Sequence, residues 1–151
     1  MAELVRFPRI DPRYACFEVV IRRSSIHRFG VYAQQLIPAN RKVIEYTGER
    51  VNRREAKRRS EGKFTYLFAV DNYWTLDGAV GGSGAEIINH SCEPNLVSRV
   101  MRGHVLYMSL RPIQRGEELT VDYNLDWNPP VTECQCGAPK CRGTLELKRR
   151  R

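Results

Sequence analysis

The chain has 151 residues, with 25 Lys and Arg against 17 Asp and Glu and a formal net charge of +8. This length predicts one domain with its own hydrophobic core, and the excess of basic residues favours an anionic partner such as nucleic acid or an acidic protein surface. The apolar runs fall short of the roughly 18 residues that a membrane span needs, and the N-terminal segment has no apolar signal-peptide core. We therefore expect a soluble intracellular protein, unless it is exported by a route that the sequence does not display.

Much of the positive charge lies in two places, residues 53–59 (RREAKRR) and residues 148–151 (KRRR). A solvated helix face and a basic tail would explain this excess as well as a contact with nucleic acid does. Both explanations stay open at the level of sequence.

The first third of the chain contains three runs rich in β-branched and aromatic residues. Residues 14–23, 31–37 and 42–51 are predicted as strands. Residues 24–30 form a loop between the first two. Gly48, inside the third run, indicates a bulge or a close approach of two backbones.

The middle of the chain begins with a helix signal. Asn52 followed by Glu55 has the spacing of a helix N-cap and its reciprocal acid, so we expect a short charged helix over 53–61. β-forming residues then predict strands over 64–71 and 74–77.

A flexible glycine-rich loop over 78–84 precedes the last predicted strands. Residues 95–101 and 104–110 flank an Arg-Gly pair at 102–103 and predict a β-hairpin. Residues 118–123 (ELTVDY) are predicted as the final strand, after which the hydrophobic periodicity stops. Many short strands at turn-spaced intervals predict a mostly β domain with an irregular tail.

The five cysteines are an odd number in a chain without a visible signal peptide, which argues against a disulfide framework. Cys134, Cys136 and Cys141 follow the pattern C-x-C-x4-C, and structural zinc takes four ligands. Cys92 is the best candidate for the fourth ligand, whereas Cys16 lies within a predicted strand and should be a small buried hydrophobic residue. We expect a zinc ion that ties the tail to the core; reduced thiols without metal are the alternative.

Three motifs, in this order and spacing, resemble the SET domain with its post-SET tail, a family of protein lysine methyltransferases that use S-adenosylmethionine. They are NHSCEPN (89–95), EELTVDY (117–123) and CQCGAPKCRG (134–143). The resemblance covers roughly residues 14–147 and, in NHSCEPNLVSRV, is nearest to the trithorax-type spelling. It implies four segments: an N-terminal arm (1–13), the SET domain (14–124), the post-SET zinc segment (125–147) and a basic tail (148–151).

The resemblance also implies an architecture: short β-sheets, few short helices and a C-terminal zinc-bound tail. In this fold residues 89–95 thread under a loop formed by residues 118–123, which makes a pseudoknot. Because no cysteine-rich segment precedes residue 14, we expect a minimal stand-alone form, as in small bacterial or viral members.

The family's functional residues can be carried over onto matching positions. Tyr123 and Tyr66 resemble the tyrosines of the lysine channel, and Asn95 and Asp122 are expected to make hydrogen bonds that hold the knot. Tyr66 as a core aromatic and His90 as a structural histidine are the alternatives. The residues implied to bind S-adenosylmethionine are Arg28, Phe29, Gly30, Tyr66, Asn89, His90 and Leu145, and those implied to bind zinc are Cys92, Cys134, Cys136 and Cys141.

Several positions depart from the family pattern. Arg28 stands where the first glycine of a Gly-x-Gly loop is usual, and would be strained there if the position needs a positive φ. Ser83 and Glu86 replace the usual Asn and Arg. Val121 and Ser98 lack the aromatic side chains that limit the number of methyl groups added, so we expect room for higher methylation states.

The implied function is methyl transfer to the ε-amine of a lysine in an extended protein tail, with histones or basic nucleoid proteins as candidate substrates. The basic residues at 53–59 and 148–151 could then lie near nucleic acid. The location would be the cytoplasm or nucleoid in a bacterium, and the nucleus or chromosome for a eukaryotic protein or a host-directed effector. A catalytically impaired SET module that binds a protein or nucleic-acid partner is the alternative. A zinc-stapled nucleic-acid-binding protein would explain the charge and the cysteines but not the other two motifs.

Overall fold

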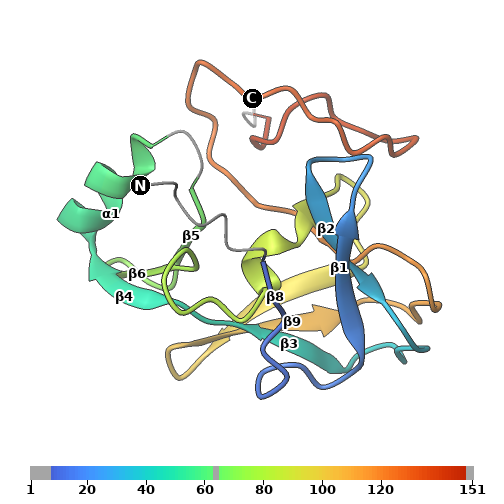
Figure 1. The fold of residues 1–151 in the computed structure, drawn as a ribbon. Coiled ribbons are helices and arrows are strands. Elements are labelled where there is room, and N and C mark those ends of the chain that lie inside the picture. The colour runs from blue at the N-terminus through green and yellow to red at the C-terminus, as the bar shows by residue number, and fades with distance from the viewer. Residues whose placement is uncertain (1–7, 63–64, 149–151) are drawn as a thin grey trace, which may run out of the picture.

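The computed structural model describes residues 8–62 and 65–148, and it confirms the predicted mostly β fold. In these residues the strands form three small sheets, accompanied by one α-helix and one short 3-10 helix. No helix in the described ranges is long and apolar enough to cross a membrane. Figure 1 shows the C-terminal tail, coloured orange to red, as a long irregular segment beyond the strands.

The largest sheet has five strands in the order β3-β9-β8-β10-β7, and the other two have the orders β4-β6-β5 and β1-β2. All neighbouring strands are antiparallel except β10, which runs parallel to both of its neighbours. The bounds are β1 (Val19–Arg23), β2 (Phe29–Ala33), β3 (Lys42–Tyr46), β4 (Glu49–Asn52), β5 (Leu67–Ala69), β6 (Trp74–Asp77), β7 (Asn89–His90), β8 (Leu96–Met101), β9 (His104–Ser109) and β10 (Thr120–Val121), with helices α1 (Arg53–Ser60) and η1 (Ala85–Ile87).

Strand β10 lies between β7 and β8, although both of these come earlier in the chain. Thr120 is paired with Asn89, and Val121 with both His90 and Leu96. The connection between β7 and β8, residues 91–95, must therefore cross β10. This crossing is the knot-like feature that positions the candidate site.

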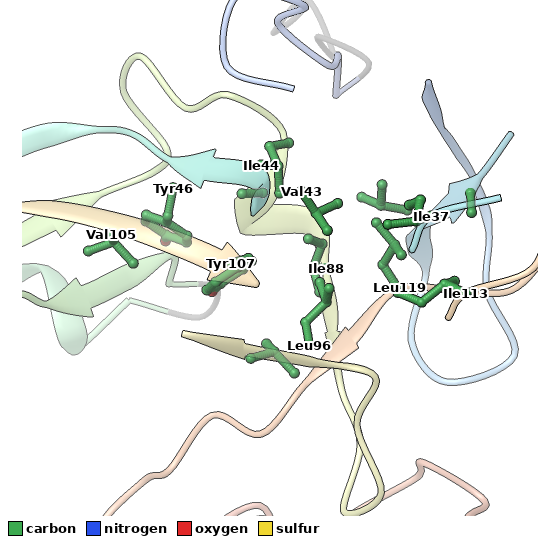
Figure 2. Close-up of a cluster of buried hydrophobic side chains, with 14 of the residues drawn as sticks. Ile37, Val43, Ile44, Tyr46, Ile88, Leu96, Val105, Tyr107, Ile113 and Leu119 are labelled. Carbon is green, nitrogen blue, oxygen red and sulfur yellow. The ribbon is translucent and has the colours of Figure 1, made fainter. Parts of the chain in front are cut away.

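The core fills the space where β2, β3, β9, η1 and β10 meet. Figure 2 shows Ile88 and Leu96 beside residues of β3 and β9 in this cluster. Ile37 and Ile113 are both fully buried and exchange backbone hydrogen bonds of 2.9 and 2.8 Å, which ties two loops together inside it. Each fully buried Val, Leu or Ile contributes about 1.5–3 kcal/mol to folding. Since Ile88, Leu96 and Leu119 belong to this cluster, its burial stabilises the strands that form the crossing.

Several of the predicted strands are wrong in extent. The first begins only at Val19, and Cys16, predicted to be buried, is exposed. The second, predicted over 31–37, is β2 and runs from Phe29 to Ala33, so the end of the predicted loop 24–30 belongs to the strand. The strand predicted over 42–51 is divided into β3 and β4 at Gly48, because the backbone turns toward β6 there. A Cβ atom on Gly48 would lie 2.4 Å from the carbonyl oxygen of Asp77, so the predicted close approach of two backbones is confirmed.

Two later strands are also shorter than predicted. The strand predicted over 64–71 is reduced to β5, and its first residue lies outside the described residues. The final strand contributes only the two residues of β10. The hairpin of β8 and β9 is confirmed, with Arg102 at φ +50° and Gly103 at φ +78° in its turn.

The predicted helix is confirmed as α1, but its capping is only half as expected. The side chain of Asn52 accepts a hydrogen bond of 3.0 Å from the backbone nitrogen of Glu55, as an N-cap should. The carboxylate of Glu55 does not return to Asn52. It accepts hydrogen bonds from Arg58 and Arg59 instead, since two guanidinium groups one turn away are stronger donors than a single backbone N–H.

Candidate functional site

The strand crossing brings the predicted residues Asn89, His90 and Tyr123 to one place. Asn89 and His90 form β7 and are 5% and 2% exposed. Tyr123 lies two residues after the end of β10, and its backbone nitrogen donates a 3.1 Å hydrogen bond to Nδ1 of His90. The two rings meet edge to face with their centroids 5.3 Å apart. The crossing thus fixes the tyrosine against the histidine.

Tyr123 is partly exposed as a whole, but its hydroxyl end is enclosed. The hydroxyl donates a 3.0 Å hydrogen bond to the carbonyl of Ile88, which is itself buried. Burial of this end raises the pKa of Tyr123 to about 12. The phenol is therefore neutral at physiological pH.

His90 is held as one tautomer by its two neighbours. Because Nδ1 accepts a hydrogen bond from Tyr123, the ring proton of neutral His90 belongs on Nε2, which lies 3.4 Å from Sγ of Cys92. Burial lowers the pKa of His90, which favours the neutral ring. One imidazole thus connects the cysteine cluster to the backbone of Tyr123.

The side-chain amide of Asn89 reaches the loop that precedes β2. Its Nδ2 lies 2.8 Å from the carbonyl oxygen of Phe29 and 3.2 Å from that of His27. The same nitrogen lies 2.9 Å from Oε1 of Glu118. Three of the residues predicted to bind the cofactor, Phe29, Gly30 and Asn89, are therefore adjacent.

Gly30 and Arg28 show what the chain requires where it enters β2. A Cβ atom on Gly30 would lie 2.1 Å from Oε1 of Glu118, so a side chain at that position would displace the carboxylate. Arg28 has φ +33°, so an arginine occupies a left-handed conformation that glycine adopts more easily. The predicted strain at Arg28 is confirmed by this angle.

Tyr66 is half-buried and lies just before β5, close to a group of other aromatic side chains. Its carbonyl accepts hydrogen bonds from the hydroxyl of Tyr46 and the backbone nitrogen of Gly78. The ring of Tyr46 lies 5.4 Å from Phe68 and 6.1 Å from Tyr107, centroid to centroid. Neither Tyr46 nor Tyr107 was predicted as a site residue, and Tyr107 is recognisable only from its place in β9.

The four cysteines that were predicted to bind metal converge. Their sulfur atoms all lie within 4.8 Å of one another, with Sγ of Cys92 3.7 Å from that of Cys134 and 3.9 Å from that of Cys141. These separations are too long for disulfides. They match the roughly 3.8 Å between sulfur atoms around a tetrahedral ion with metal–sulfur bonds of ~2.3 Å. The cluster can therefore hold a metal ion.

A second link fastens the tail beside the crossing. Arg142 donates two hydrogen bonds, of 2.7 and 3.1 Å, to the carboxylate of Asp122. It also holds the carbonyls of Leu145 and Glu146, and the backbone nitrogen of Arg142 lies 3.4 Å from Sγ of Cys92. Leu145, predicted to cover the cofactor, is half-buried in this part of the tail. The sequence suggested Asp122 as a knot residue but did not identify its partner.

The remaining departures are accommodated locally. Ser83 is fully buried and donates a hydrogen bond of 2.5 Å to the carbonyl of Glu45. The carboxylate of Glu86 accepts one of 2.8 Å from the backbone of Gly84, and burial raises its pKa. Neither contact distorts β7, which begins two residues after η1 ends.

A crossing of this kind, with a buried Asn-His pair and a tyrosine two residues after the inserted strand, is the arrangement expected of a SET domain. The family model described as "SET domain" matches residues 28–124. The chain belongs to the SET domain family.

Individual relatives make the comparison more specific. The chain is 38% identical over 136 residues to "Histone-lysine N-methyltransferase trithorax" of Drosophila virilis, which aligns 84% of this chain with 4% of that protein. It is 40% identical over 134 residues to "Histone-lysine N-methyltransferase ATX2" of Arabidopsis thaliana, covering 82% and 12% respectively. It is 37% identical over 155 residues to "Histone-lysine N-methyltransferase, H3 lysine-4 specific" of Schizosaccharomyces pombe, covering 95% and 16%. The chain thus spans between 4% and 16% of the length of these curated relatives.

Proposed function

We propose that this chain transfers a methyl group from S-adenosylmethionine to the ε-amine of a lysine in an extended protein tail, with a histone as the leading substrate. The observation that carries the proposal is the meeting of Asn89, His90 and Tyr123 at the strand crossing of a SET domain. The names of the relatives, all histone-lysine N-methyltransferases, support the same reaction.

The cofactor would lie along the loop before β2 and the buried pair of β7. S-adenosylmethionine supplies an electrophilic methyl group on a sulfonium. The absence of a side chain at Gly30 lets the loop backbone approach a ligand closely, and the acceptors around Asn89 suit a polar amino-acid group. The proposed cofactor-binding residues are Arg28, Phe29, Gly30, Tyr66, Asn89, His90 and Leu145.

The substrate lysine must lose a proton before it can accept the methyl group. With a pKa near 10.4, deprotonation at pH 7 costs about 4.6 kcal/mol, at ~1.36 kcal/mol per pH unit. An aromatic surrounding built from Tyr66 and Tyr123 would lower this cost by removing water from the ammonium group. The channel's other contribution would be alignment of the amine with the methyl group.

Tyr123 is proposed as an orienting residue and not as a general base. Its pKa of about 12 makes the neutral phenol the dominant form. Since the hydroxyl hydrogen points to Ile88, the oxygen lone pairs are available for the amine and for the positive charge on the transferring methyl group.

Two small residues support a product with more than one methyl group. Val121 is 3% exposed and lies in β10, directly before the site. Ser98 is half-buried in β8 and is paired with Tyr107. Because neither carries a large ring, we predict that mass spectrometry of the methylated lysine will detect dimethyl or trimethyl product. A purely monomethyl product at full conversion would contradict this.

Val121→Phe should shift the product toward monomethyl. Val97→Phe, at the position next to Ser98 in β8, serves as a control for added bulk.

The substrate tail would bind as an extra strand. Tyr66 directly precedes β5, which is the edge strand of its sheet. An exposed strand edge presents backbone groups that an extended peptide can pair with. This edge would deliver a lysine side chain toward Tyr66 and Tyr123.

A zinc ion is proposed for the thiol cluster. Four cysteine ligands are typical of structural zinc, in which no position stays open for substrate. Backbone N–H groups of Arg142 and Gly143 lie 3.4 Å from Sγ of Cys92 and Cys141 and would help to stabilise thiolates. Its role would be to hold the tail, and Leu145 with it, against the crossing.

A nucleic-acid contact near the substrate is a second candidate, and helix α1 favours it. Arg59 is held by carboxylates of Glu49, Glu55 and Asp77. In the described part of the chain, three other basic residues of the helix form no ion pair and are exposed: Arg53, Arg54 and Lys57. The part of the 148–151 tail beyond residue 148 lies outside the described residues. Such a contact would place the enzyme on chromatin in a nucleus, or on a nucleoid, and its affinity for DNA should fall steeply with salt.

The deciding experiment is transfer of labelled methyl from S-adenosylmethionine to core histones and to cell lysate. Wild type should label a discrete band, and Tyr123→Phe should lower kcat by about 10²- to 10³-fold, the effect of one lost preorganised contact. Tyr73→Phe changes the same group on a side chain that is 73% exposed in the turn between β5 and β6, and should leave kcat unchanged. If wild type binds S-adenosylhomocysteine but labels nothing, the chain is an impaired SET module. Loss of that binding as well would contradict the proposed function.

A further inference from the structure

Glu118 lies where the loop before β2, strand β7 and the segment leading into β10 meet. Ser24 Oγ lies 2.8 and 2.9 Å from its two carboxylate oxygens. Tyr32 donates its hydroxyl to Oε2 over 3.3 Å, and Asn89 Nδ2 lies 2.9 Å from Oε1. These donors are all neutral, so they satisfy the carboxylate by hydrogen bonds without cancelling its charge.

The backbone of this residue is fixed on both sides. Glu118 bridges to Tyr32 of β2, and its carbonyl accepts a 2.8 Å hydrogen bond from Nδ2 of Asn95. The next residue, Leu119, is fully buried and bonds to the carbonyl of Val31 over 2.7 Å. The backbone of Glu118 is therefore fixed by the crossing, and the carboxylate is held beside the loop by the side-chain contacts of Ser24 and Asn89.

Three acceptors converge on one nitrogen at this junction. Nδ2 of Asn89 lies within 3.2 Å of the carbonyls of His27 and Phe29 and of the Glu118 carboxylate. A side-chain amide has only two N–H hydrogens. Carbonyl and carboxylate oxygens can each accept more than one hydrogen bond, so this set can receive a further donor, and one of its members is a carboxylate.

A primary ammonium group matches this set, because it offers three donors, no acceptor and a positive charge. A ligand ammonium at this point would make charge-assisted hydrogen bonds, which are stronger than neutral ones. Because Gly30 has no side chain, no Cβ atom occupies the position 2.1 Å from Oε1.

We propose that Glu118 is the counter-ion for the α-ammonium group in the methionine part of S-adenosylmethionine. The inference rests on the proposed function, since it assumes that the site binds this ligand. It assigns Glu118 a binding role that is specific for the amino-acid end, and none for the adenosine end.

The test compares two ligands that differ only at that end. S-adenosylhomocysteine carries the α-ammonium group, whereas 5′-methylthioadenosine shares the adenosine and the sulfur but has no amino-acid part. For Glu118→Gln, we expect the Kd for S-adenosylhomocysteine to rise about 10- to 100-fold, the size of one lost charged hydrogen bond. The Kd for 5′-methylthioadenosine, measured by competition, should be unchanged. Glu117→Gln removes the neighbouring carboxylate, which pairs with Arg111 instead, and should alter neither affinity.

The outcomes separate the two proposals. If wild type binds neither ligand, the proposed function fails. If wild type binds S-adenosylhomocysteine and Glu118→Gln binds it equally well, only the counter-ion role fails. An equal loss for both ligands would show that Glu118 merely holds the fold, and would also overturn the inference.

A second variant covers the case in which Glu118→Gln does not fold. Ser24→Ala removes one donor that aims the carboxylate and leaves the charge in place. It should weaken S-adenosylhomocysteine by a smaller factor than Glu118→Gln and leave 5′-methylthioadenosine unchanged. If Ser24→Ala binds S-adenosylhomocysteine as tightly as wild type does, that result would count against the proposal.

Discussion

Asn95 uses both ends of its side-chain amide to hold the strand crossing. Its Nδ2 donates to the carbonyl of Glu118 and its Oδ1 accepts from the backbone nitrogen of Thr120, each over 2.8 Å. The residue is 3% exposed, so water cannot replace either bond. This is the knot-holding role that the sequence motif predicted for it.

We predict that Asn95→Ala destabilises the protein by about 2–4 kcal/mol, because two buried backbone groups lose their partners. Urea denaturation at equilibrium measures this. Asn72→Ala, at an exposed turn, should stay within about 0.5 kcal/mol of wild type. A similar effect for both variants would mean that the amide of Asn95 does not hold the crossing.

Residues that act through a distant partner were the hardest to predict. Cys92 could be proposed as a metal ligand because thiolates come in sets of four, so one missing ligand is conspicuous. Glu118 and Asp122 belong to no set of fixed size, so the sequence gives no sign that a partner is missing. They are two of 17 Asp and Glu residues, and only the folded chain reveals that they meet Asn89 and Arg142.

At the scale of elements, one arginine of α1 forms the ion pairs that link the helix to strands β4 and β6. Arg59 reaches three carboxylates, including that of Asp77, which is 6% exposed. Arg58 pairs only with Glu55, at the surface. The same residue type therefore plays two different parts one position apart.

We predict that Arg59→Ala lowers the melting temperature more than Arg58→Ala, because only the first leaves a buried carboxylate without its cation. Hydrogen bonds from Arg58 and Arg59 lower the pKa of Glu55 from 4.5 to about 2. A carboxyl group with a depressed pKa contributes stability above its ordinary pKa and loses it as pH falls toward the folded value. The contribution of these pairs should thus fade between pH 4.5 and 2 in thermal scans. An equal effect of the two variants at pH 7 would refute the distinction.

The elements that were predicted well are those whose signals are local. Helix α1 and the β8–β9 hairpin depend on a cap and a turn that lie within a few residues. Strand β10 was predicted too long because its pairing ends within two residues: Thr120 pairs with Asn89 alone, and Val121 pairs with both His90 and Leu96. The residues before Val19 failed for the same reason: they have β-forming side chains, but only Ala15 bridges to another strand. A propensity cannot report whether a partner strand is present.

At the scale of the whole molecule, the thiol cluster joins residues that are far apart in the chain. Cys92 belongs to the crossing, while the other three sulfurs belong to the tail. Residues 125–147, all of which the structure describes, form no helix or strand, and their isolated backbone bridges join Leu125 to Glu146 and Glu133 to Thr144. A metal ion would therefore supply much of the free energy that orders it.

We predict one bound metal ion per chain, lost in Cys134→Ser together with part of the thermal stability and with the binding of S-adenosylhomocysteine. Elemental analysis measures the bound metal, and differential scanning calorimetry measures the thermal stability. Cys16→Ser changes a thiol that is exposed and outside the cluster, and should keep the metal. Metal retained in Cys134→Ser, or absent from wild type purified with zinc, would contradict the prediction.

The place of β10 also dictates an order of assembly. A protein is synthesised from its N-terminus, so β7 and β8 leave the ribosome before the strand that joins them exists. Until residues 120–121 arrive, neither strand has its parallel partner. The Asn-His pair, the amide of Asn95 and Tyr123 can meet only in that last step. The nascent chain therefore cannot assemble its candidate site early, and its folding must wait for the segment that closes the sheet.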